Sequence, residues 1–167
     1  MADLKSILKM GMEEWNTESN MFAGLDRALE GLTAGQAAWK DDGTDNSIRE
    51  IVHHLIFWNS RWLARFMGLP VEDAGEFSNE STFFKDHTAV QPDKALWEGA
   101  VQKLKQVHIE WIRALEECDE EMLLTSESPE RLWWEKIMAM NLHSAHHLGQ
   151  IILIRKRQGS WEPVDWD

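Results

Sequence analysis

Two histidines that stand four residues apart, His143 and His147, lie in the segment LHSAHHLGQI, and a third, His54, lies far upstream in SIREIVHHLIFW. Both segments have the apolar periodicity of helices. Residues i and i+4 of a helix share one face with their Cβ atoms about 6 Å apart, so two imidazoles can bind one metal ion about 2 Å from each. A third imidazole from a neighbouring helix leaves a coordination position open for water or substrate, as in catalytic metal centres.

The spacing of the histidine pair is a weak indication by itself. Seven histidines in 167 residues give about 0.25 pairs of this spacing by chance. The surroundings of His143 and His147 favour the metal site, because both share a helix face that is otherwise largely apolar. That face carries Met140, Gln150, Ile151 and Ile154. Two unpaired imidazoles in an apolar core are costly, and a shared metal ion would satisfy both.

The choice of the third ligand lies between two adjacent histidines. His54 shares the inner face of its helix with Ile51, Leu55 and Trp58, whereas His53 is turned about 100° away. We therefore prefer His54. The remaining histidines are interpreted as ordinary surface or core residues, and they are His53, His87, His108 and His146.

No carboxylate has a clear place as a general base. Glu50 lies one turn before the third histidine, but with Ser47 it also forms a capping box, which is our preferred interpretation. Gln150 lies three residues past His147 and either orients a ligand or packs between helices. Trp58, one turn beyond His54, would line the cavity, although simple core packing is the preferred interpretation. The lack of a base favours metal-activated thiol chemistry over a protease-like mechanism.

Four amphipathic helices are expected to position these residues. Glycines and prolines mark several of their ends, at Gly31, Pro70, Pro92 and Gly159. The expected ranges are 3–30, 47–68, 92–115 and 128–157. The stretch 69–91 lacks a period and is interpreted as a long connection, which can travel back along a helix and join two parallel ones. We predict an all-α protein: one domain over residues 1–167, an up-down-down-up four-helix bundle, with a flexible insertion as the alternative for 69–91.

Composition excludes several classes of protein. The net charge of −12 argues against nucleic-acid binding, and the basic run RKRQ is interpreted as the last turn of a helix. Most of the ten tryptophans are expected in the core, at a pocket wall or in a subunit interface, and the tail with Trp161 and Trp166 is expected to fold back on the helices. The single Cys118 excludes an internal disulfide. With no signal peptide and no apolar run of about 20 residues, we predict a cytoplasmic protein without membrane contact.

Three features together resemble the DinB/YfiT-like superfamily of metalloenzymes. They are SIREIVHHLIFW at the start of the second helix, LHSAHHLGQI in the fourth, and the trailing RQGSW. The resemblance spans nearly the whole chain and implies an up-down-down-up bundle. It also implies that the family's three-histidine site falls on His54, His143 and His147, that the cofactor is a divalent metal ion such as zinc or nickel, and that the protein is a homodimer.

The resemblance leaves several activities open. Some members act as thiol-dependent S-transferases that use bacillithiol, mycothiol or glutathione, and others are described as metal-dependent hydrolases. The leading prediction is a metal-dependent enzyme that activates a thiol, as a thiol S-transferase, or water, as a hydrolase. Its partner would be a small-molecule substrate such as a low-molecular-weight thiol. The alternative is a non-catalytic, metal-stabilised binding protein of the stress response.

Overall fold

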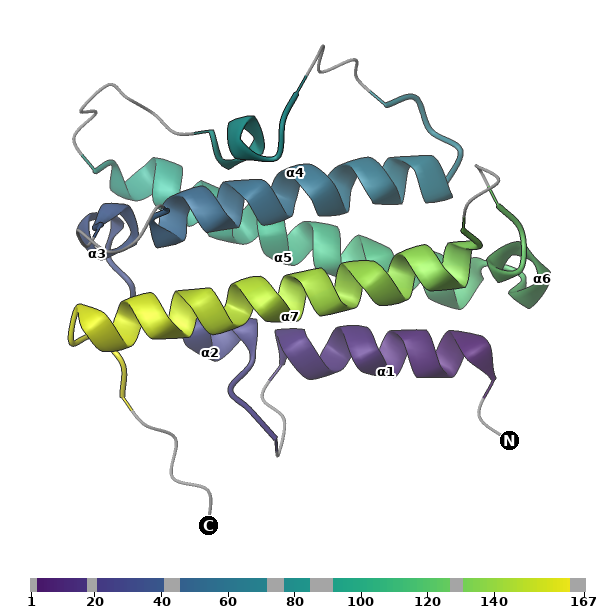
Figure 1. Ribbon diagram of the computed structural model, residues 1–167, viewed down its shortest axis with the longest axis horizontal. Helices are drawn as coiled ribbons and strands as arrows, with labels where there is room; N and C mark the ends of the chain where they lie inside the picture. Colours follow the sequence, from purple (N-terminus) through teal and green to yellow (C-terminus); the bar gives the residue numbers. More distant parts are fainter. Residues whose placement is uncertain are drawn as a thin grey trace.

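The computed structural model is all-helical, as the sequence predicted (Figure 1). It describes residues 3–17, 21–40, 46–71, 77–84, 92–126 and 131–162. Within these ranges the chain forms seven α-helices and one 3₁₀ helix, η1. They are α1 (Leu4–Asn16), α2 (Leu25–Leu29), α3 (Ala34–Ala38), α4 (Ile48–Phe66), η1 (Glu80–Phe83), α5 (Lys94–Glu117), α6 (Glu120–Leu123) and α7 (Trp133–Arg157).

The long helices α1, α4, α5 and α7 lie side by side and enclose the core (Figure 1). Helix α4 packs against α5 and α7, and α1 packs against the same two helices. Indole N–H groups form hydrogen bonds between neighbouring helices. Trp111 donates to the carbonyl oxygen of Asn59 at 3.0 Å, and Trp15 donates to the side-chain oxygen of Asn141 at 3.3 Å. All nine tryptophans in the described ranges are buried or half-buried, as predicted, and Trp166 lies outside those ranges. Among the described helices, none has both the length and the apolar content that crossing a bilayer requires.

The first predicted helix, over 3–30, is wrong, because α1 ends at Asn16 and a separate α2 begins at Leu25. Thr17 has an extended backbone, with ψ 170°, and the backbone of Gly24 packs closely against the backbone of Thr17. A Cβ atom at Gly24 would lie 1.9 Å from the Thr17 carbonyl oxygen. The apolar period continues across this break, so periodicity alone does not locate it; the close contact of two backbone segments does.

Other helix boundaries also differ from the predicted ones. The stretch after Gly31 contains α3, which a capping box of Thr33 and Gln36 begins. The third long helix begins at Lys94 rather than at Pro92, because the Asp93 carboxylate accepts the Leu96 N–H at 3.0 Å and caps it. The predicted start of the fourth helix, near Ser128 and Pro129, lies outside the described residues, and α7 begins at Trp133. The short helix α6 was not predicted at all.

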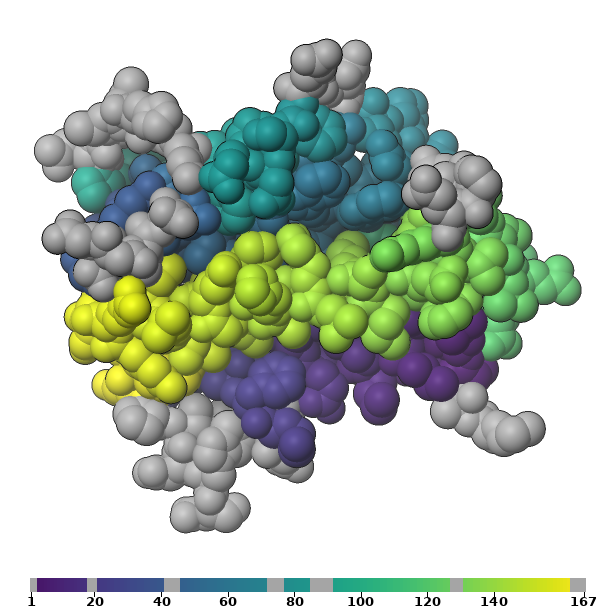
Figure 2. Space-filling model, in the orientation of Figure 1, coloured from purple at the N-terminus to yellow at the C-terminus, as the bar shows by residue number. Residues whose placement is uncertain are grey.

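The stretch 69–91, predicted to be an irregular connection, contains η1 in its described part. Figure 2 shows η1 lying over α4, next to α7. Thr82 and Phe83 of η1 are buried, and Phe84 ends the turn with a left-handed backbone at φ 49°. The connection therefore places two side chains between the helices that carry the predicted histidines.

Buried His108 of α5 is expected to make the protein sensitive to acid. It packs against Trp15, and burial lowers the pKa of His108 to about 4, although nearby Asp26 raises it. Because unfolding restores a pKa near 6.5, the unfolded chain binds more protons between pH 6.5 and 4, and stability falls as the pH falls through that window. We expect His108→Leu to match the native protein at pH 7.5 and to exceed its free energy of unfolding by about 2 kcal/mol at pH 4.5. Urea titrations at both pH values measure this, and identical pH dependence of the two proteins would contradict it.

Candidate metal centre

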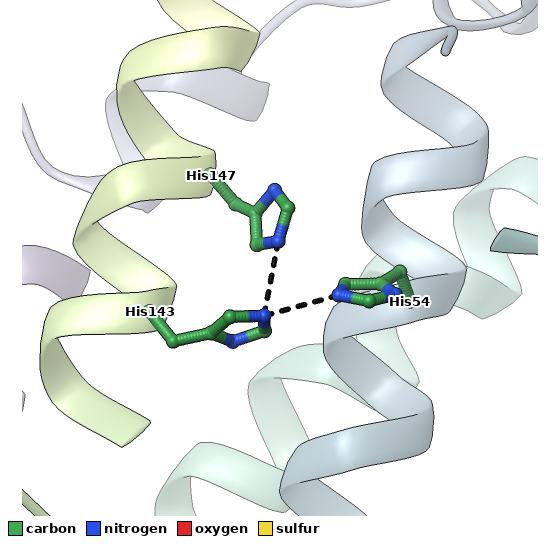
Figure 3. Close-up of side chains that lie close together, drawn as sticks. All are labelled: His54, His143 and His147. Atoms are coloured by element: carbon green, nitrogen blue, oxygen red, sulfur yellow. Dashed lines mark hydrogen bonds between the residues drawn. The ribbon is translucent and has the colours of Figure 1, made fainter. Parts of the chain in front are cut away.

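The three predicted histidines meet between α4 and α7. His54 extends from α4, and His143 and His147 extend from successive turns of α7, with all three rings pointing toward one another (Figure 3). The Nε2 atom of His143 lies 3.1 Å from the Nε2 of His54 and 3.1 Å from the Nε2 of His147. The structure therefore brings together the residues that the sequence singled out, and it brings His54 rather than His53 to the pair.

The outer nitrogen of His54 is held by η1. Its Nδ1 lies 2.8 Å from the hydroxyl oxygen of Thr82, and that hydroxyl donates to the carbonyl oxygen of Asn79 at 2.6 Å. Since a hydroxyl has one hydrogen, Thr82 must accept from His54. The proton of neutral His54 is thereby fixed on Nδ1, and the lone pair of Nε2 faces the other two histidines.

Gln150 has the same role for His147. The side-chain oxygen of Gln150 lies 2.6 Å from Nδ1 of His147, and its amide nitrogen lies 3.2 Å from Nε2 of His146. The amide oxygen can only accept, so neutral His147 carries its proton on Nδ1 and also turns the lone pair of Nε2 inward. Gln150 thus contacts a histidine of the cluster, as the first of the two functions considered for it requires.

The inward nitrogens fit a metal ion and do not satisfy one another without one. His54 and His147 both present lone pairs, and a single proton on Nε2 of His143 can bridge to only one of them. Two nitrogens bound to one tetrahedral zinc ion at the usual bond length lie about 3.3 Å apart, close to the observed spacing. Partners that fix the outer nitrogens of histidine ligands are a regular feature of metal sites.

Burial keeps these imidazoles in the neutral form that binds metals. Burial, with smaller effects from His147 and His143, lowers the pKa of His54 to about 3. Burial lowers the pKa of His147 to about 4, although the bond to Gln150 raises it, and burial followed by the charge of His146 lowers the pKa of His143. Phe83 contributes to this apolar environment by stacking on His54, with ring centres 4.0 Å apart.

A cavity of about 510 Å³ opens beside His143. Trp58 lines it, which is the less favoured of the two roles considered for this residue, and the two cations Arg131 and Lys136 lie on its wall. The other lining residues are Trp62, Asn79, Ala139 and Met140. Lys136 lies over the rings of Trp62 and Trp133, at 5.5 and 4.9 Å from their centres. No carboxylate is among the described residues that line this cavity.

Glu50, considered above as a base, is engaged elsewhere. Its carboxylate accepts the backbone N–H of Ser47 at 2.7 Å and pairs with Lys40 at 2.8 Å. The bond from Ser47 is the capping contact that was preferred for Glu50, and the ion pair with Lys40 occupies its other oxygen. His53 and Glu50 line a different cavity, between α4 and α5.

Sequence patterns gave no sign of the contribution of η1. Asn79, Thr82 and Phe83 lie in a stretch without a helical period, and none of them is of a type that suggests a metal ligand. They reach His54 only because the connection folds back over α4. Residues that contact a metal ligand from a distant segment can be identified only once the fold of the backbone is known.

Comparison with protein families gives a match that covers most of the chain. A family model described as the DinB superfamily matches residues 20–151. The chain belongs to the DinB superfamily. This confirms the resemblance drawn from the sequence, and the matched range includes all three histidines of the cluster. A search of curated proteins and a search of solved structures each gave no match.

Membership of the DinB superfamily and the cluster of three histidines both fit metal binding. Thr82 and Gln150, which hold the outer nitrogens of two of these histidines, provide a test. We expect Gln150→Leu and Thr82→Val each to weaken zinc binding about 10- to 100-fold, because the freed Nδ1 no longer fixes the ring or its tautomer. Competition with a chromogenic zinc chelator measures the affinity. Gln106→Leu is the matched control, since among the described residues the Gln106 side chain bonds only Glu110, on the exposed side of α5. Unchanged affinity in both site variants would contradict the orienting role.

Proposed function

We propose that this DinB protein is a metal-dependent thiol S-transferase whose divalent ion, zinc or nickel, is held by His54, His143 and His147. The observation that carries the proposal is the convergence of three Nε2 atoms beside a cavity that contains aromatic and cationic side chains. When bound there, a divalent ion would supply Lewis acidity that lowers the pKa of a thiol or a water molecule. The donor set of three neutral imidazoles leaves that acidity undiminished by ligand carboxylates.

The lining of the cavity favours a thiol over water as the nucleophile. Hydrolysis by a metal site usually employs a carboxylate base, as in metalloproteases, and the described lining has none. A thiol needs only to lose its proton to solvent before it attacks. In the proposed reaction the thiol proton passes to solvent, a carbon–sulfur bond forms, and the bond from carbon to the leaving group breaks, so that the leaving group departs as an anion.

The chain's own residues would bind and orient the thiol. Arg131 and Lys136 offer two positive charges to acidic groups of a low-molecular-weight thiol. Trp58 and Trp62 offer apolar walls for the electrophile and exclude water from it. A site of this composition suits a thiol compound that carries carboxylates and an electrophile that carries an apolar group.

The scaffold proposed for this activity is one domain, over residues 1–167, with an up-down-down-up bundle. One observation supports the topology and another supports the single domain. In Figure 1, α4 and α5 both begin at the end of the molecule that holds α3, whereas α1 and α7 both begin at the opposite end, beside α6. The core extends without interruption from Leu8 to Ile154, which supports a single domain.

The experiment begins with untagged protein and a measurement of its metal content. Transfer of a low-molecular-weight thiol to a chlorobimane is then followed by fluorescence, before and after removal of the metal by a chelator and again after zinc or nickel is restored. We expect transfer to fall at least 100-fold on removal and to return with the metal. A rate of thiol transfer that is the same with and without metal would contradict the proposal.

Two other outcomes would support a different function for the metal centre. Metal-dependent cleavage of an activated ester, with no thiol transfer, would assign the centre to the hydrolase alternative. Stoichiometric metal with neither activity would favour a non-catalytic binding protein. The same preparation tests the expected homodimer by gel filtration, and cell fractionation tests the expected cytoplasmic location.

A further inference from the structure

A second cavity, of about 490 Å³, lies between α4 and α5. It is separate from the metal centre: none of the three clustered histidines lines it, and the adjacent His53 does. Ala34 of α3 and Phe84, which follows η1, close two of its sides. Its volume lies within the range of small-molecule sites.

The walls of this cavity are mainly apolar. Ile56 of α4 and Trp97 and Ala100 of α5 form its sides, and Leu96 and Phe84 lie at its exposed edge. The exposed fraction of Leu96 is 69% and that of Phe84 is 54%. Large apolar side chains at the mouth of an apolar cavity favour a ligand with a hydrocarbon portion.

The cavity is lined by two carboxylates that have partners and by two cations that have none within the described part of the chain. The two carboxylates are already engaged, since Glu50 accepts from the cap of α4 and pairs with Lys40, and Asp93 caps α5. Arg49 and Lys103 also line the cavity, and neither has an ion pair or side-chain hydrogen bond with any residue in the described part of the chain. Arg49 is half-buried and Lys103 is exposed, so both can reach a ligand in the cavity.

The helix ends beside the cavity are already capped. Both α4 and α5 begin at the same end of the molecule (Figure 1), and residues from their first turns line the cavity. The partial positive charge of each amino end is offset by a carboxylate, that of Glu50 in α4 and that of Asp93 in α5. The groups of the lining that remain open to a ligand are therefore the two cations, Arg49 and Lys103, which favour an anion.

We propose that this cavity binds a small organic carboxylate with an apolar chain. The carboxylate lies against Arg49 and Lys103, and the chain packs against Trp97, Leu96 and Ile56. The site is independent of the proposed transferase activity, because it lies on the other side of α4 from the clustered histidines. A long, saturated monocarboxylate such as decanoate is a suitable probe.

Calorimetric titration with decanoate and with decanol tests both parts of the proposed ligand. We expect decanoate to bind at one site and decanol to bind at least ten-fold more weakly, because the alcohol lacks the charge that Arg49 and Lys103 receive. A carboxylate can also ligate a metal ion, so the titration is repeated with His143→Ala, in which decanoate should bind unchanged. Equal affinity for the alcohol, or loss of decanoate binding in His143→Ala, would overturn the proposal.

Paired substitutions locate the site. Arg49→Gln and Lys103→Gln should each weaken decanoate binding about ten-fold, whereas Lys156→Gln, an exposed cation of α7, should not. Leu96→Glu should also weaken binding about ten-fold by placing a negative charge at the mouth. Leu142→Glu is its control, since Leu142 is 66% exposed on α7 and does not line the cavity. Native affinity in Arg49→Gln, Lys103→Gln and Leu96→Glu, with native circular dichroism, would place decanoate elsewhere.

Discussion

His143→Ala is expected to reduce zinc affinity by more than 100-fold. Nε2 of His143 lies 3.1 Å from both of the other inward nitrogens, so it is the shared neighbour of the cluster. Loss of an outer hydrogen-bond partner typically costs 10- to 100-fold in metal affinity, and loss of a ligand itself must exceed that. Metal content after dialysis against a chelator, followed by competition titration, gives the affinity.

The control for this substitution is His146→Ala on the same helix. His146 is exposed and contacts the cluster through Gln150 and the edge of the His147 ring. Its loss should change zinc affinity less than ten-fold. Thermal unfolding separates metal loss from misfolding, because metal-free native protein and His143→Ala should unfold at similar temperatures. Full metal content in dialysed His143→Ala would refute the three-histidine centre.

The sequence alone was sufficient to predict that the three clustered histidines face inward, because their orientation follows from helix periodicity. An i,i+4 pair on α7 and the apolar neighbours of His54 on α4 determine which rings face inward, and no tertiary information is needed for that step. The same rule distinguished His54 from His53. Local pattern therefore predicts the part of the site that lies on long, regular helices.

The parts that could not be predicted depend on contacts between distant segments. Thr82 reaches His54 because the connection folds over α4, and the break at Gly24 exists because its backbone touches Thr17. Neither contact leaves a periodic signal. The box of Thr33 and Gln36 was a local signal for α3, of the same kind that located the start of α4, but the short helix lay in a stretch whose composition favoured a loop.

Arg155 is expected to be the largest single contributor to stability among the cations of α7. It lies in the basic last turn that the sequence predicted, yet it points inward and is only 9% exposed. One guanidinium nitrogen donates to the carbonyl oxygens of Arg27, Ala28 and Glu30, at 3.0 to 3.2 Å. The other donates to Ser160 at 2.6 Å, and the guanidinium lies over the ring of Trp161, 5.4 Å from its centre. Arg155 thus donates to carbonyl oxygens at the end of α2 and also holds the chain that follows α7.

Replacing Arg155 with Leu should lower the free energy of unfolding by about 3 to 4 kcal/mol, because several partly buried carbonyl oxygens lose a charged donor together. Arg155→Lys should recover only a small part, since an ammonium lacks the planar fork that reaches carbonyls on both sides. Lys156→Leu, at the adjacent exposed position, should change stability by less than about 0.5 kcal/mol. Urea denaturation gives all three values. If Arg155→Leu lowers the free energy of unfolding by less than about 1 kcal/mol, water must replace the guanidinium at the carbonyl oxygens without cost. The position of α2 would then depend on apolar packing alone.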